Sequence, residues 1–379
     1  MTARERVGIL TGGGDCAGLN PAIKWAAKGL LDPEMSREHK RSIEVIGIRR
    51  GWAGLVNLDP KKGTADPNLL PLDEVTVRTW DRLGGTNLGS SRTNPFRDRK
   101  TLNRCVRNYG ALKFEAVIAI GGEDTLGVAE GLREHGVNVV GVPKTIDKDL
   151  CGTDYSLGFS TAVEVIAEEI GRLRTTAGSH ERIFVVETMG RHAGHLAMQG
   201  GIAGGACMIL IPEVDFDEER VVGILKKRKK MGARYDIVVV AEGAKPGKRR
   251  EVTQSGEVDE FGHVRLGGIG EHLRKKIKEA KISEVRSVIL SHLQRGGAPS
   301  AYDVRMGRAF GLAAAELVMR RDYGRMVSLR DNRITSVPIQ EAIQKDEHGR
   351  TKLNLVNAAV EYDEERYIAR RRVLGMKMY

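Results

Sequence analysis

Three short segments of the sequence place glycines next to carboxylates and a lysine, the residue types that bind and transfer phosphate. They are TGGGD at residues 11–15, GGEDT at 121–125 and PKTIDKD at 143–149. In the first segment, three consecutive glycines allow backbone N–H groups to approach an anion at the start of a helix, where the helix dipole also favours negative charge. Such a turn also occurs in folds that bind no phosphate, so this segment alone leaves both interpretations open.

The second segment carries two adjacent carboxylates, Glu123 and Asp124, followed by Thr125. A structural interpretation makes Asp124 or Thr125 the N-cap of the next helix. A second carboxylate beside two glycines goes beyond what capping needs, and it suits Mg²⁺ held by oxygen and water ligands with a phosphate close by. We therefore expect this turn to bind a metal ion and phosphate.

The third segment offers a general base. If it is extended, Asp147 and Asp149 point to the same side, because alternate residues of a strand share a face. One carboxylate could then accept a proton from an attacking hydroxyl while the other binds metal. Phosphoryl transfer needs little more from a protein than such a base and nearby cations. Two acids in a solvated loop would be the default interpretation of this segment taken alone.

Basic side chains that could hold a phosphorylated substrate follow in the second half of the chain. Guanidinium groups bind phosphate through paired hydrogen bonds, so several arginines near strand ends indicate a phosphate on the substrate. The residues at or just beyond the ends of three predicted strands are Arg182, Arg191, Arg286, His292 and Arg295.

The elements that must position these residues alternate between short β-branched runs and longer amphipathic segments, which is typical of βαβ units around a parallel sheet. The predicted strands span residues 7–10, 45–48, 116–120, 137–142, 183–187, 207–211, 237–241 and 285–290. The predicted helices span residues 125–135, 161–175, 218–231 and 302–320, and another begins near Asn20. In open α/β sheets ligands gather at the carboxyl ends of the strands. The polar, glycine-containing stretch 245–265 predicts a surface hairpin or loop.

The length of 379 residues exceeds one ordinary core and predicts two domains. The sequence has no signal-type start and no apolar run near the roughly 20 residues of a bilayer span, so we expect a cytoplasmic protein without a membrane partner.

The four cysteines lie far apart, which predicts reduced thiols. The formal charge of +11 admits polyanions, but the KKRKK run at 226–230 lacks interleaved aromatics. It therefore predicts a solvated helix face and no nucleic-acid partner.

Seven motifs occur in a fixed order along the chain. They are TGGGDCAGLN (11–20), GGTNLGSSR (84–92), GGEDT (121–125), PKTIDKD (143–149), ERIFVVETMGRHAG (181–194), AEG (241–243) and SHLQRGG (291–297). The ordered set resembles the 6-phosphofructokinase family, in particular its pyrophosphate-dependent type, over roughly residues 7–310. The resemblance implies two Rossmann-like three-layer α/β/α domains with mostly parallel sheets. Residues 1–158 plus about 294–344 would bind the donor phosphate, and residues 159–293 plus about 345–379 the sugar phosphate.

The resemblance also implies a reaction, the reversible transfer of a phosphoryl group from pyrophosphate to the 1-hydroxyl of fructose 6-phosphate, in glycolysis or gluconeogenesis, with Mg²⁺ as cofactor. Asp147 would deprotonate the hydroxyl, with Thr145 and Asp149 supporting the transferring phosphate and its metal. Arg191 would also neutralise the transferred group. The residues implied for the sugar phosphate are Arg182, Met189, Gly190, Arg191, Glu242, Arg286, His292 and Arg295. Those implied for the donor phosphates are Gly14, Arg92, Asp124, Thr125 and Lys144, and those for the metal are Glu123 and Asp149.

Two positions bear on the donor. ATP-using members of the family commonly carry glycine where this chain has Asp124 and Lys144, whereas pyrophosphate-using members are similar to this sequence at both. A carboxylate at Asp124 would repel the α-phosphate of ATP, while Lys144 can reach the donor phosphates, and pyrophosphate ends before the clash. Thr93 stands where ATP-using relatives can carry an aromatic residue, which also favours pyrophosphate.

Further implications concern assembly and departures from the family pattern. In bacterial relatives the residues matching Arg182 and Arg286 come from the neighbouring subunit, so the resemblance implies a homodimer or homotetramer with shared active sites. Glu123 replaces a common aspartate, which affects the metal geometry, and Lys148 replaces a common asparagine, which adds a cation beside the base. Ala17 stands where proline is common.

Three alternatives remain open at this point. The first is the same enzyme using ATP. The second is a dinucleotide-dependent dehydrogenase, which predicts an acidic residue after the second strand, where the sequence has Arg49 and Arg50. The third is a nucleic-acid-binding protein, which predicts salt-sensitive binding of polyanions at the KKRKK run.

Overall fold

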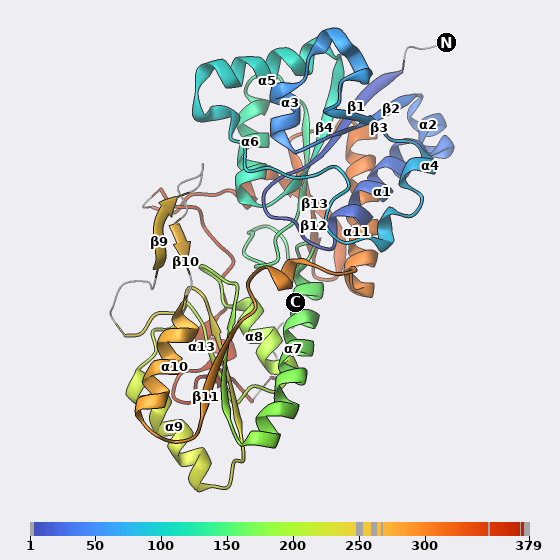
Figure 1. The fold of residues 1–379 in the computed structure, drawn as a ribbon. Helices are drawn as coiled ribbons and strands as arrows, with labels where there is room; N and C mark the ends of the chain where they lie inside the picture. The colour runs from blue at the N-terminus through green and yellow to red at the C-terminus, as the bar shows by residue number, and fades with distance from the viewer. Residues whose placement is uncertain are drawn as a thin grey trace. The chain divides into compact units, whose positions relative to one another are not determined.

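The computed structural model describes residues 4–247, 253–258, 264–266, 268–347, 349–371 and 373–374. The chain forms two compact units, each built around its own sheet (Figure 1). Unit 1 comprises Met1–Ile146, Leu150–Thr161 and Arg295–Lys352; unit 2 comprises Asp147–Asp149, Ala162–Gln294 and Leu353–Tyr379. The boundaries of the donor and sugar domains, as the resemblance implies them, remain a prediction.

Unit 1 is built on a seven-stranded sheet in the order β13-β12-β5-β4-β1-β2-β3. The strands are β1 (Glu5–Thr11), β2 (Ile43–Ile48), β3 (Leu69–Pro71), β4 (Phe114–Gly121), β5 (Val139–Pro143), β12 (Arg325–Arg330) and β13 (Arg333–Pro338). The five inner strands are parallel, and β3 and β13 at the edges are antiparallel to their neighbours. The central strands are buried on both faces, which explains why they read as continuous apolar runs.

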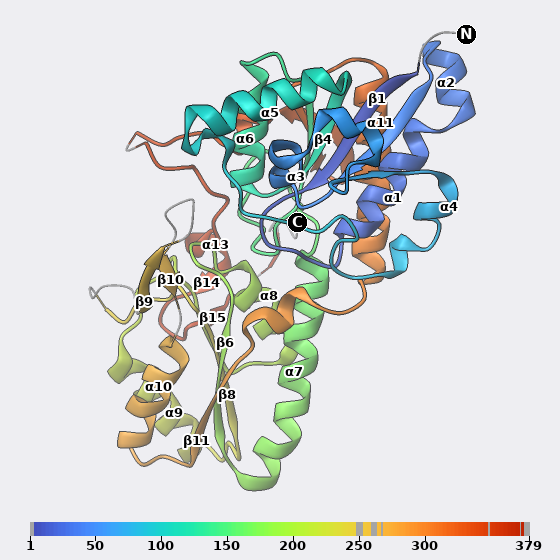
Figure 2. The ribbon, with the colours of Figure 1, turned by 45° about the horizontal axis from the view of Figure 1, so that its top comes forward.

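Helices cover both faces of this sheet, as two views show (Figures 1 and 2). They are α1 (Leu19–Leu30), α2 (Pro33–His39), α3 (Trp52–Asn57), α4 (Glu74–Val77), α5 (Arg99–Ala111), α6 (Glu123–Arg133), α11 (Ala301–Met319) and α12 (Ile339–Ala342), with 3₁₀ helices at Pro60–Ala65, Trp80–Arg82 and Pro95–Arg97. Helices α1 and α11 approach closely because Gly311 leaves room. A Cβ at that position would lie 2.6 Å from the carbonyl oxygen of Ala22.

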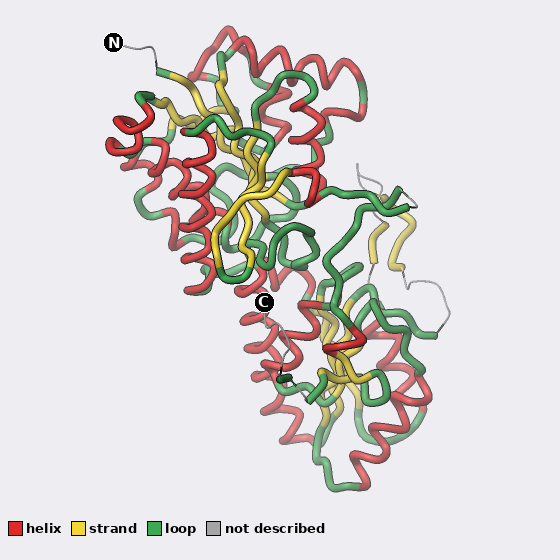
Figure 3. The backbone as a smooth tube through the Cα atoms, turned by 180° about the vertical axis from the view of Figure 1, so that it is seen from behind, coloured by secondary structure: helices red, strands yellow, loops and turns green. Residues whose placement is uncertain are grey.

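Unit 2 contains a four-stranded parallel sheet in the order β11-β6-β8-β7. The strands are β6 (Ile183–Thr188), β7 (Met208–Leu210), β8 (Asp236–Ala241) and β11 (Val285–Ile289). Two antiparallel pairs join β9 (Thr253–Val258) with β10 (Val264–Leu266) and β14 (Tyr362–Asp363) with β15 (Ile368–Ala369). The helices are α7 (Phe159–His180), whose first turn belongs to unit 1, α8 (His195–Gly204), α9 (Glu218–Lys230), α10 (Ile269–Glu279) and α13 (Ala358–Glu361), with a 3₁₀ helix at Ser291–Arg295. Figure 3 shows helices on both sides of the strands.

The structure confirms the α/β class and every predicted strand to within three residues at either end. Helix α7 extends beyond the predicted span 161–175, from Phe159 to His180. The pair β9–β10 agrees with the hairpin expected in 245–265, of which residues 248–252 and 259–263 lie outside the described part. The sequence reasoning missed the hairpin β12–β13. Its two-residue turn places Asp331 and Asn332 at positive φ, a conformation that these residue types tolerate.

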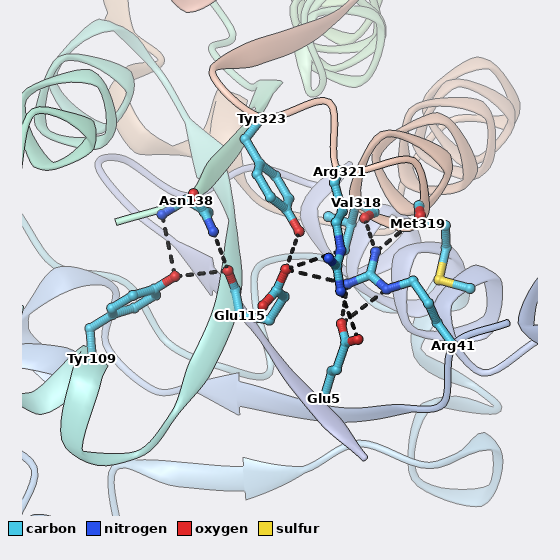
Figure 4. A network of polar contacts seen from close by, with 9 residues as sticks. All are labelled: Glu5, Arg41, Tyr109, Glu115, Asn138, Val318, Met319, Arg321 and Tyr323. Carbon is cyan, nitrogen blue, oxygen red and sulfur yellow. Dashed lines mark hydrogen bonds and ion pairs between the residues drawn. The ribbon is translucent and has the colours of Figure 1, made fainter. Parts of the chain in front are cut away.

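At the amino ends of β1 and β4, charged and polar side chains form one network (Figure 4). The buried guanidinium of Arg41 donates to Glu5 through Nε at 3.0 Å and to the carbonyl oxygen of Met319 at 3.0 Å. The second arginine, Arg321, donates to Glu5 at 2.9 Å and lies 3.5 Å from Glu115. Burial would raise the pKa of Glu5, but hydrogen bonds and charges from Arg41 and Arg321 lower it overall. This network joins the start of the sheet to the end of α11.

Candidate active site

Three loops of unit 1 meet at the carboxyl edge of its sheet, because β5, β4 and β1 are neighbours. The TGGGD segment follows β1, the GGEDT segment follows β4, and Lys144 follows β5. The three segments that sequence reasoning singled out therefore reach the same edge, with only residues 147–149 of the third assigned to unit 2. In a sheet of this kind that edge is where ligands bind.

The glycine loop after β1 is held by its backbone. Gly13 has a φ of +76°, its N–H donates to the carbonyl oxygen of Ser91 at 3.0 Å, and its own carbonyl oxygen accepts from the hydroxyl of Ser90. Gly12 must be glycine because a Cβ there would lie 2.5 Å from Oγ1 of Thr125. The buried side chain of Thr125 thus fills the space between the two glycine turns, and Arg92 follows Ser91 on the exposed side.

Helix α6 begins at Glu123, and its N-cap is Gly122, without a side-chain hydrogen bond. The expectation that Asp124 or Thr125 is the N-cap is therefore wrong. Both carboxylates, Glu123 and Asp124, lie in the first turn, where the helix dipole favours negative charge. N-capping therefore does not explain the two carboxylates, because the N-cap Gly122 makes no side-chain hydrogen bond to the first N–H groups of α6.

Lys144 is buried, with an exposed fraction of 3%. Its backbone N–H donates to the carbonyl oxygen of Gly121 at 3.0 Å, and its ammonium donates to the carbonyl oxygen of Gly14. The cation therefore lies inside the glycine loop. Arg295 reaches the same loop from the start of the α11 segment, and its Nη1 donates to the carbonyl oxygen of Asp15 at 3.1 Å. The structure thus brings Gly14, Lys144 and Arg295 together on unit 1.

In unit 2, the loops after β6 and β8 lie side by side. The N–H of Glu242 donates to the carbonyl oxygen of Thr188 at 2.9 Å, and the N–H of Gly243 donates to that of Gly190 at 3.2 Å. Gly190 has a φ of +128°. Met189, Gly190, Arg191 and Glu242 are therefore brought together, as the sequence reasoning expected.

Gln294 was missed by the sequence reasoning. Its side chain is buried, its Oε1 accepts from the N–H of Met189 at 3.2 Å, and its Nε2 donates to the carbonyl oxygen of Ser291 at 2.9 Å. It therefore links the loop after β6 to the loop after β11. Its place in SHLQRGG, between two predicted site residues, was the signal that could have found it.

The pKa of Glu242 is raised to about 7, first by burial and then by the nearby carboxylate of Asp147, although the charge of Arg191 acts in the opposite direction. Asp147 and Arg191 are thus near enough to Glu242 to affect its charge, and all three residues belong to unit 2. The two carboxylates could accept hydrogen bonds from hydroxyl groups, and the arginine could bind a phosphate.

The segment that carries Asp147 and Asp149 is not extended, which corrects the sequence expectation. A turn occupies residues 146–147, and Lys148 has a φ of +56°. The alternation of a strand therefore does not apply to the two carboxylates. The segment is held instead by Asn354, whose N–H donates to the carbonyl oxygen of Asp149 at 2.8 Å and whose Nδ2 donates to that of Lys148 at 2.9 Å.

His195 is a second residue that the sequence reasoning did not single out. Its Nε2 lies 3.1 Å from the carbonyl oxygen of Asn354, and burial, followed by the charge of Lys148, lowers its pKa to about 4. Because Asn354 lies far from residues 147–149 in the sequence, no local pattern could have shown this contact. The neutral imidazole completes the support of the Asp147–Asp149 turn.

Arg182 and Arg286 lie at the opposite ends of their strands from Met189 and His292, although the sequence reasoning placed all the basic candidates at or just beyond strand ends. Arg182 precedes β6, and Arg286 is the second residue of β11, so both are at amino ends. They share a carboxylate, Glu284, which accepts from Nε of Arg182 at 2.6 Å and pairs with Arg286. His292, by contrast, follows β11 and is exposed, with Nδ1 3.0 Å from the hydroxyl of Ser291.

A metal ion would find few ligands in the protein alone. Within the described ranges, no three His, Cys, Asp or Glu side chains group as metal ligands. Mg²⁺ usually takes one or two carboxylates and completes its shell with water and substrate phosphates. Glu123 fits this role: its carboxylate is 34% exposed, accepts from the hydroxyl of Thr351 and lies 3.9 Å from Lys345.

None of the described helices is both long and apolar enough to cross a bilayer.

The profile of the phosphofructokinase family matches residues 6–318. The chain belongs to the phosphofructokinase family. The pyrophosphate–fructose 6-phosphate 1-phosphotransferase of Dictyoglomus thermophilum is 48% identical over 338 residues, which is 89% of this chain and 93% of the relative. The protein of the same name from Streptomyces coelicolor is 49% identical over 340 residues, 89% of this chain and 94% of the relative. Relatives named as ATP-dependent 6-phosphofructokinases also match this phosphofructokinase, at 38–42% identity.

Solved structures agree with this family. The pyrophosphate-dependent phosphofructokinase of Nitrosospira multiformis superposes with a TM-score of 0.77, over 97% of this chain and 89% of that chain, at 21% identity. At this identity the likeness concerns the fold alone. It confirms the phosphofructokinase-like fold with mostly parallel sheets.

Proposed function

We propose that this phosphofructokinase transfers a phosphoryl group from pyrophosphate to the 1-hydroxyl of fructose 6-phosphate, giving fructose 1,6-bisphosphate and phosphate, reversibly. The observation that carries the proposal is the ammonium of Lys144, buried inside the glycine loop against Gly14. A fixed cation among backbone N–H groups suits a compact, highly charged donor such as pyrophosphate. The names of the two relatives at 48–49% identity support the same donor.

On the donor side, Gly14, Lys144 and Arg92 would bind the donor phosphates, with Thr125 shaping the loop beneath them. Asp124 lies in the first turn of α6, where a longer donor would bring its next phosphate. Like charges in close contact disfavour binding, so Asp124 would exclude ATP while leaving pyrophosphate unaffected.

On the sugar side, Asp147 would take the proton from the 1-hydroxyl as that oxygen attacks the terminal phosphorus, and the P–O bond to the leaving phosphate breaks. Arg191 would neutralise the transferred group, and Thr145 would support it. Glu242 and the backbone of Met189 and Gly190 would orient the sugar. His292 and Arg295 would take part in binding the 6-phosphate.

Mg²⁺ would be held by Glu123 and Asp149 together with donor phosphates. When bound, it would neutralise charge on the phosphates. Glu123 has the exposure for this role. The family supports Mg²⁺ in general terms, and its place in this chain is a proposal, as is the cytoplasmic location.

We further propose a homodimer or homotetramer in which active sites are shared. Strand β6 alone spans about 20 Å at 3.3 Å per residue. Arg182 and Arg286 therefore stand too far from Met189 and His292 to hold the same small substrate within one chain. A second copy that supplies these two arginines removes the difficulty. Mixing two inactive variants, Arg182→Ala and Asp147→Ser, tests this directly, because mixed oligomers with shared sites regain activity and unshared sites do not.

The decisive assay compares donors. Purified protein with fructose 6-phosphate, Mg²⁺ and pyrophosphate should form the bisphosphate and release phosphate. Turnover with ATP and none with pyrophosphate would overturn the donor assignment. The double variant Asp124→Gly with Lys144→Gly should raise the ratio of ATP-supported to pyrophosphate-supported kcat/KM at least about tenfold, by removing a like-charge contact. Asp124→Gly alone is the matched control for the loss of the buried lysine.

The rival classes have less support. Strand β2 ends at Ile48, so Arg49 occupies the place where a dinucleotide-dependent dehydrogenase needs a carboxylate. The KKRKK run forms the last turn of α9, where cations suit the helix dipole, and Arg228 lies 2.6 Å from Asp236. That run therefore has a structural explanation.

A further inference from the structure

Asp303, in the first turn of α11, is a carboxylate with no exposed surface that none of the proposed roles uses. Its Oδ1 accepts from the hydroxyl of Tyr155 at 2.9 Å and from the N–H of Gly158 at 2.7 Å. Its Oδ2 accepts from the N–H of Thr161 at 2.9 Å and from the hydroxyl of the same residue at 2.6 Å. Four donors therefore converge on one buried side chain.

The direction of these bonds follows from their neighbours. The hydroxyl of Tyr155 accepts from the N–H of Ser160 at 3.1 Å, and the hydroxyl of Thr161 accepts from the N–H of Ser300 at 3.0 Å. Each hydroxyl therefore has its own proton to give to Asp303. The carboxylate of Asp303 thus binds the start of α7. The start of its own helix, α11, is capped by Ser300, whose hydroxyl accepts from the N–H of Asp303 at 3.1 Å.

The segment that Asp303 holds runs alongside the residues after β5. Leu157 pairs with Lys144 in a parallel bridge, and the N–H of Leu157 donates to the carbonyl oxygen of Pro143 at 3.1 Å. The hydroxyl of Ser156, also buried, donates to the carbonyl oxygen of Thr145 at 2.7 Å. Residues 155–158 therefore form a rail: one side is fixed by Asp303 and the other side supports Lys144 and Thr145.

Asp303 and the rail 155–158 also lie against the residues that follow the glycine loop. The sulfhydryl of Cys16 donates to the carbonyl oxygen of Leu157 at 3.4 Å. A Cβ on Gly18 would lie 3.2 Å from Oδ1 of Asp303 and 2.9 Å from the Cβ of Leu157. The carboxylate therefore lies where the rail, the start of α1 and the start of α7 meet.

We propose that Asp303 is a positioning residue for phosphoryl transfer, which fixes the rail 155–158 and through it the backbone of Lys144 and Thr145. This inference rests on the proposed function for its kinetic consequence, and on the hydrogen bonds alone for its structural one. A buried carboxylate is costly to retain unless its bonds are fully used, and here each one serves the segment beside the proposed donor site.

The first test replaces Asp303 by asparagine, which keeps the shape but turns one acceptor into a donor. Either orientation of the amide sets an N–H₂ group against a backbone N–H of the rail or of α7. We expect kcat to fall about 10- to 100-fold, as small displacements of reacting groups do. The KM for fructose 6-phosphate should change little, because the proposed sugar contacts other than Arg295 belong to unit 2.

The second test uses Ser156→Ala, which removes one bond to Thr145 and leaves all four bonds to Asp303. It should lower kcat a few-fold with the same unchanged KM for the sugar. Glu5→Gln is the matched control, because it weakens a buried ion network at the other end of the same sheet. It should lower stability and leave kcat as in the wild type.

Amide hydrogen exchange gives a readout that does not depend on activity. The amide of Leu157 should exchange faster in Asp303→Asn than in the wild type and in Glu5→Gln. If the wild type shows no phosphotransfer, the proposed function fails and this exchange rate alone decides the positioning role. Wild-type kcat with unchanged exchange in a folded Asp303→Asn would overturn the inference; if that variant does not fold, wild-type kcat in Ser156→Ala would overturn it.

Discussion

At the amino ends of β1 and β4, charged side chains neutralise one another, whereas at the carboxyl ends of the same strands glycines and backbone amides dominate. Arg41 binds Glu5 and two carbonyl groups of α11 in the first region (Figure 4). In the second region, the buried ammonium of Lys144 donates to the backbone carbonyl oxygen of Gly14. In the first region, the charged groups stabilise the fold. In the second region, the ammonium of Lys144 and the glycine turns lie at the sheet edge where ligands bind in folds of this kind.

Helix starts differ in the same way. Helices α2, α4, α5 and α9 have aspartate N-caps whose side chains accept from the first turn. Helices α1, α6 and α8, which follow loops of the candidate site, have glycine N-caps at Gly18, Gly122 and Gly194, and α3 and α10 share this feature at Gly51 and Gly268. A glycine cap leaves the N–H groups of the first turn available to an anion.

The largest expected effect comes from Asp147→Ser, which removes the proposed base. We expect kcat to fall about 10²- to 10⁴-fold, with a modest change in the KM for fructose 6-phosphate, because a base acts mainly in the transition state. Steady-state assays with pyrophosphate measure both constants. Near-normal kcat would remove Asp147 from its role.

Glu5→Gln should lower the free energy of unfolding by about 2 kcal/mol, because it removes the nearer of the two carboxylates that pair with the buried Arg41 and leaves Glu115 at 3.6 Å. The folded-state pKa of Glu5 lies below its ordinary value of 4.5, so its stabilising contribution is present above pH 4.5 and is lost as the pH falls through the folded pKa. Urea unfolding at pH 7 and at acidic pH measures the difference. An equal difference at both pH values would contradict the electrostatic explanation.

Glu242→Gln should raise the free energy of unfolding at high pH, which is the opposite of the effect expected for Glu5→Gln. The pKa of Glu242 is raised to about 7, so the folded state loses stability as the pH rises from 4.5 through 7. At pH 8 the neutral variant should be more stable by about 2 kcal/mol, and at pH 4 the two proteins should be equal. The KM for the sugar should rise, because a proposed hydroxyl contact is weakened. A destabilised variant at pH 8 would show that Glu242 stabilises the fold in its charged form.

The smallest effect is expected at Glu284, which pairs with both Arg182 and Arg286. An incoming phosphate has to compete with this carboxylate, and exposed pairs are worth at most about 1 kcal/mol. Glu284→Gln should therefore lower the KM for fructose 6-phosphate about 2- to 5-fold without changing kcat. Glu316→Gln, which breaks another exposed pair at 3.3 Å from Arg320, is the matched control. A raised KM would mean that Glu284 orients the arginines instead.

The sequence predicted the strands and the glycine turns well, because both depend on short-range rules. Runs such as residues 116–120 are apolar throughout since both faces of β4 are buried, and that pattern is visible locally. The N-cap of α6 was misassigned because Asp124 and Thr125 are good capping residues, yet Thr125 turns inward to fill the space above Gly12 and Gly121. Packing between the two glycine turns therefore decided which residue is the N-cap of α6.

The amino-acid sequence by itself determined the fold class, the family and the identity of the groups able to do chemistry, since ordered motifs and apolar periodicity are local properties. Only the tertiary structure decided which of those groups meet. It separated Arg182 from Met189 along β6 and Arg286 from His292 along β11, and it placed Asp147 and Asp149 on either side of a turn at Lys148. It also joined distant residues, Asn354 to Lys148 and Asp303 to Gly158, because the chain returns to each unit after long excursions. Contacts between residues so far apart produce no periodic pattern in the sequence, so the sequence alone could not predict them.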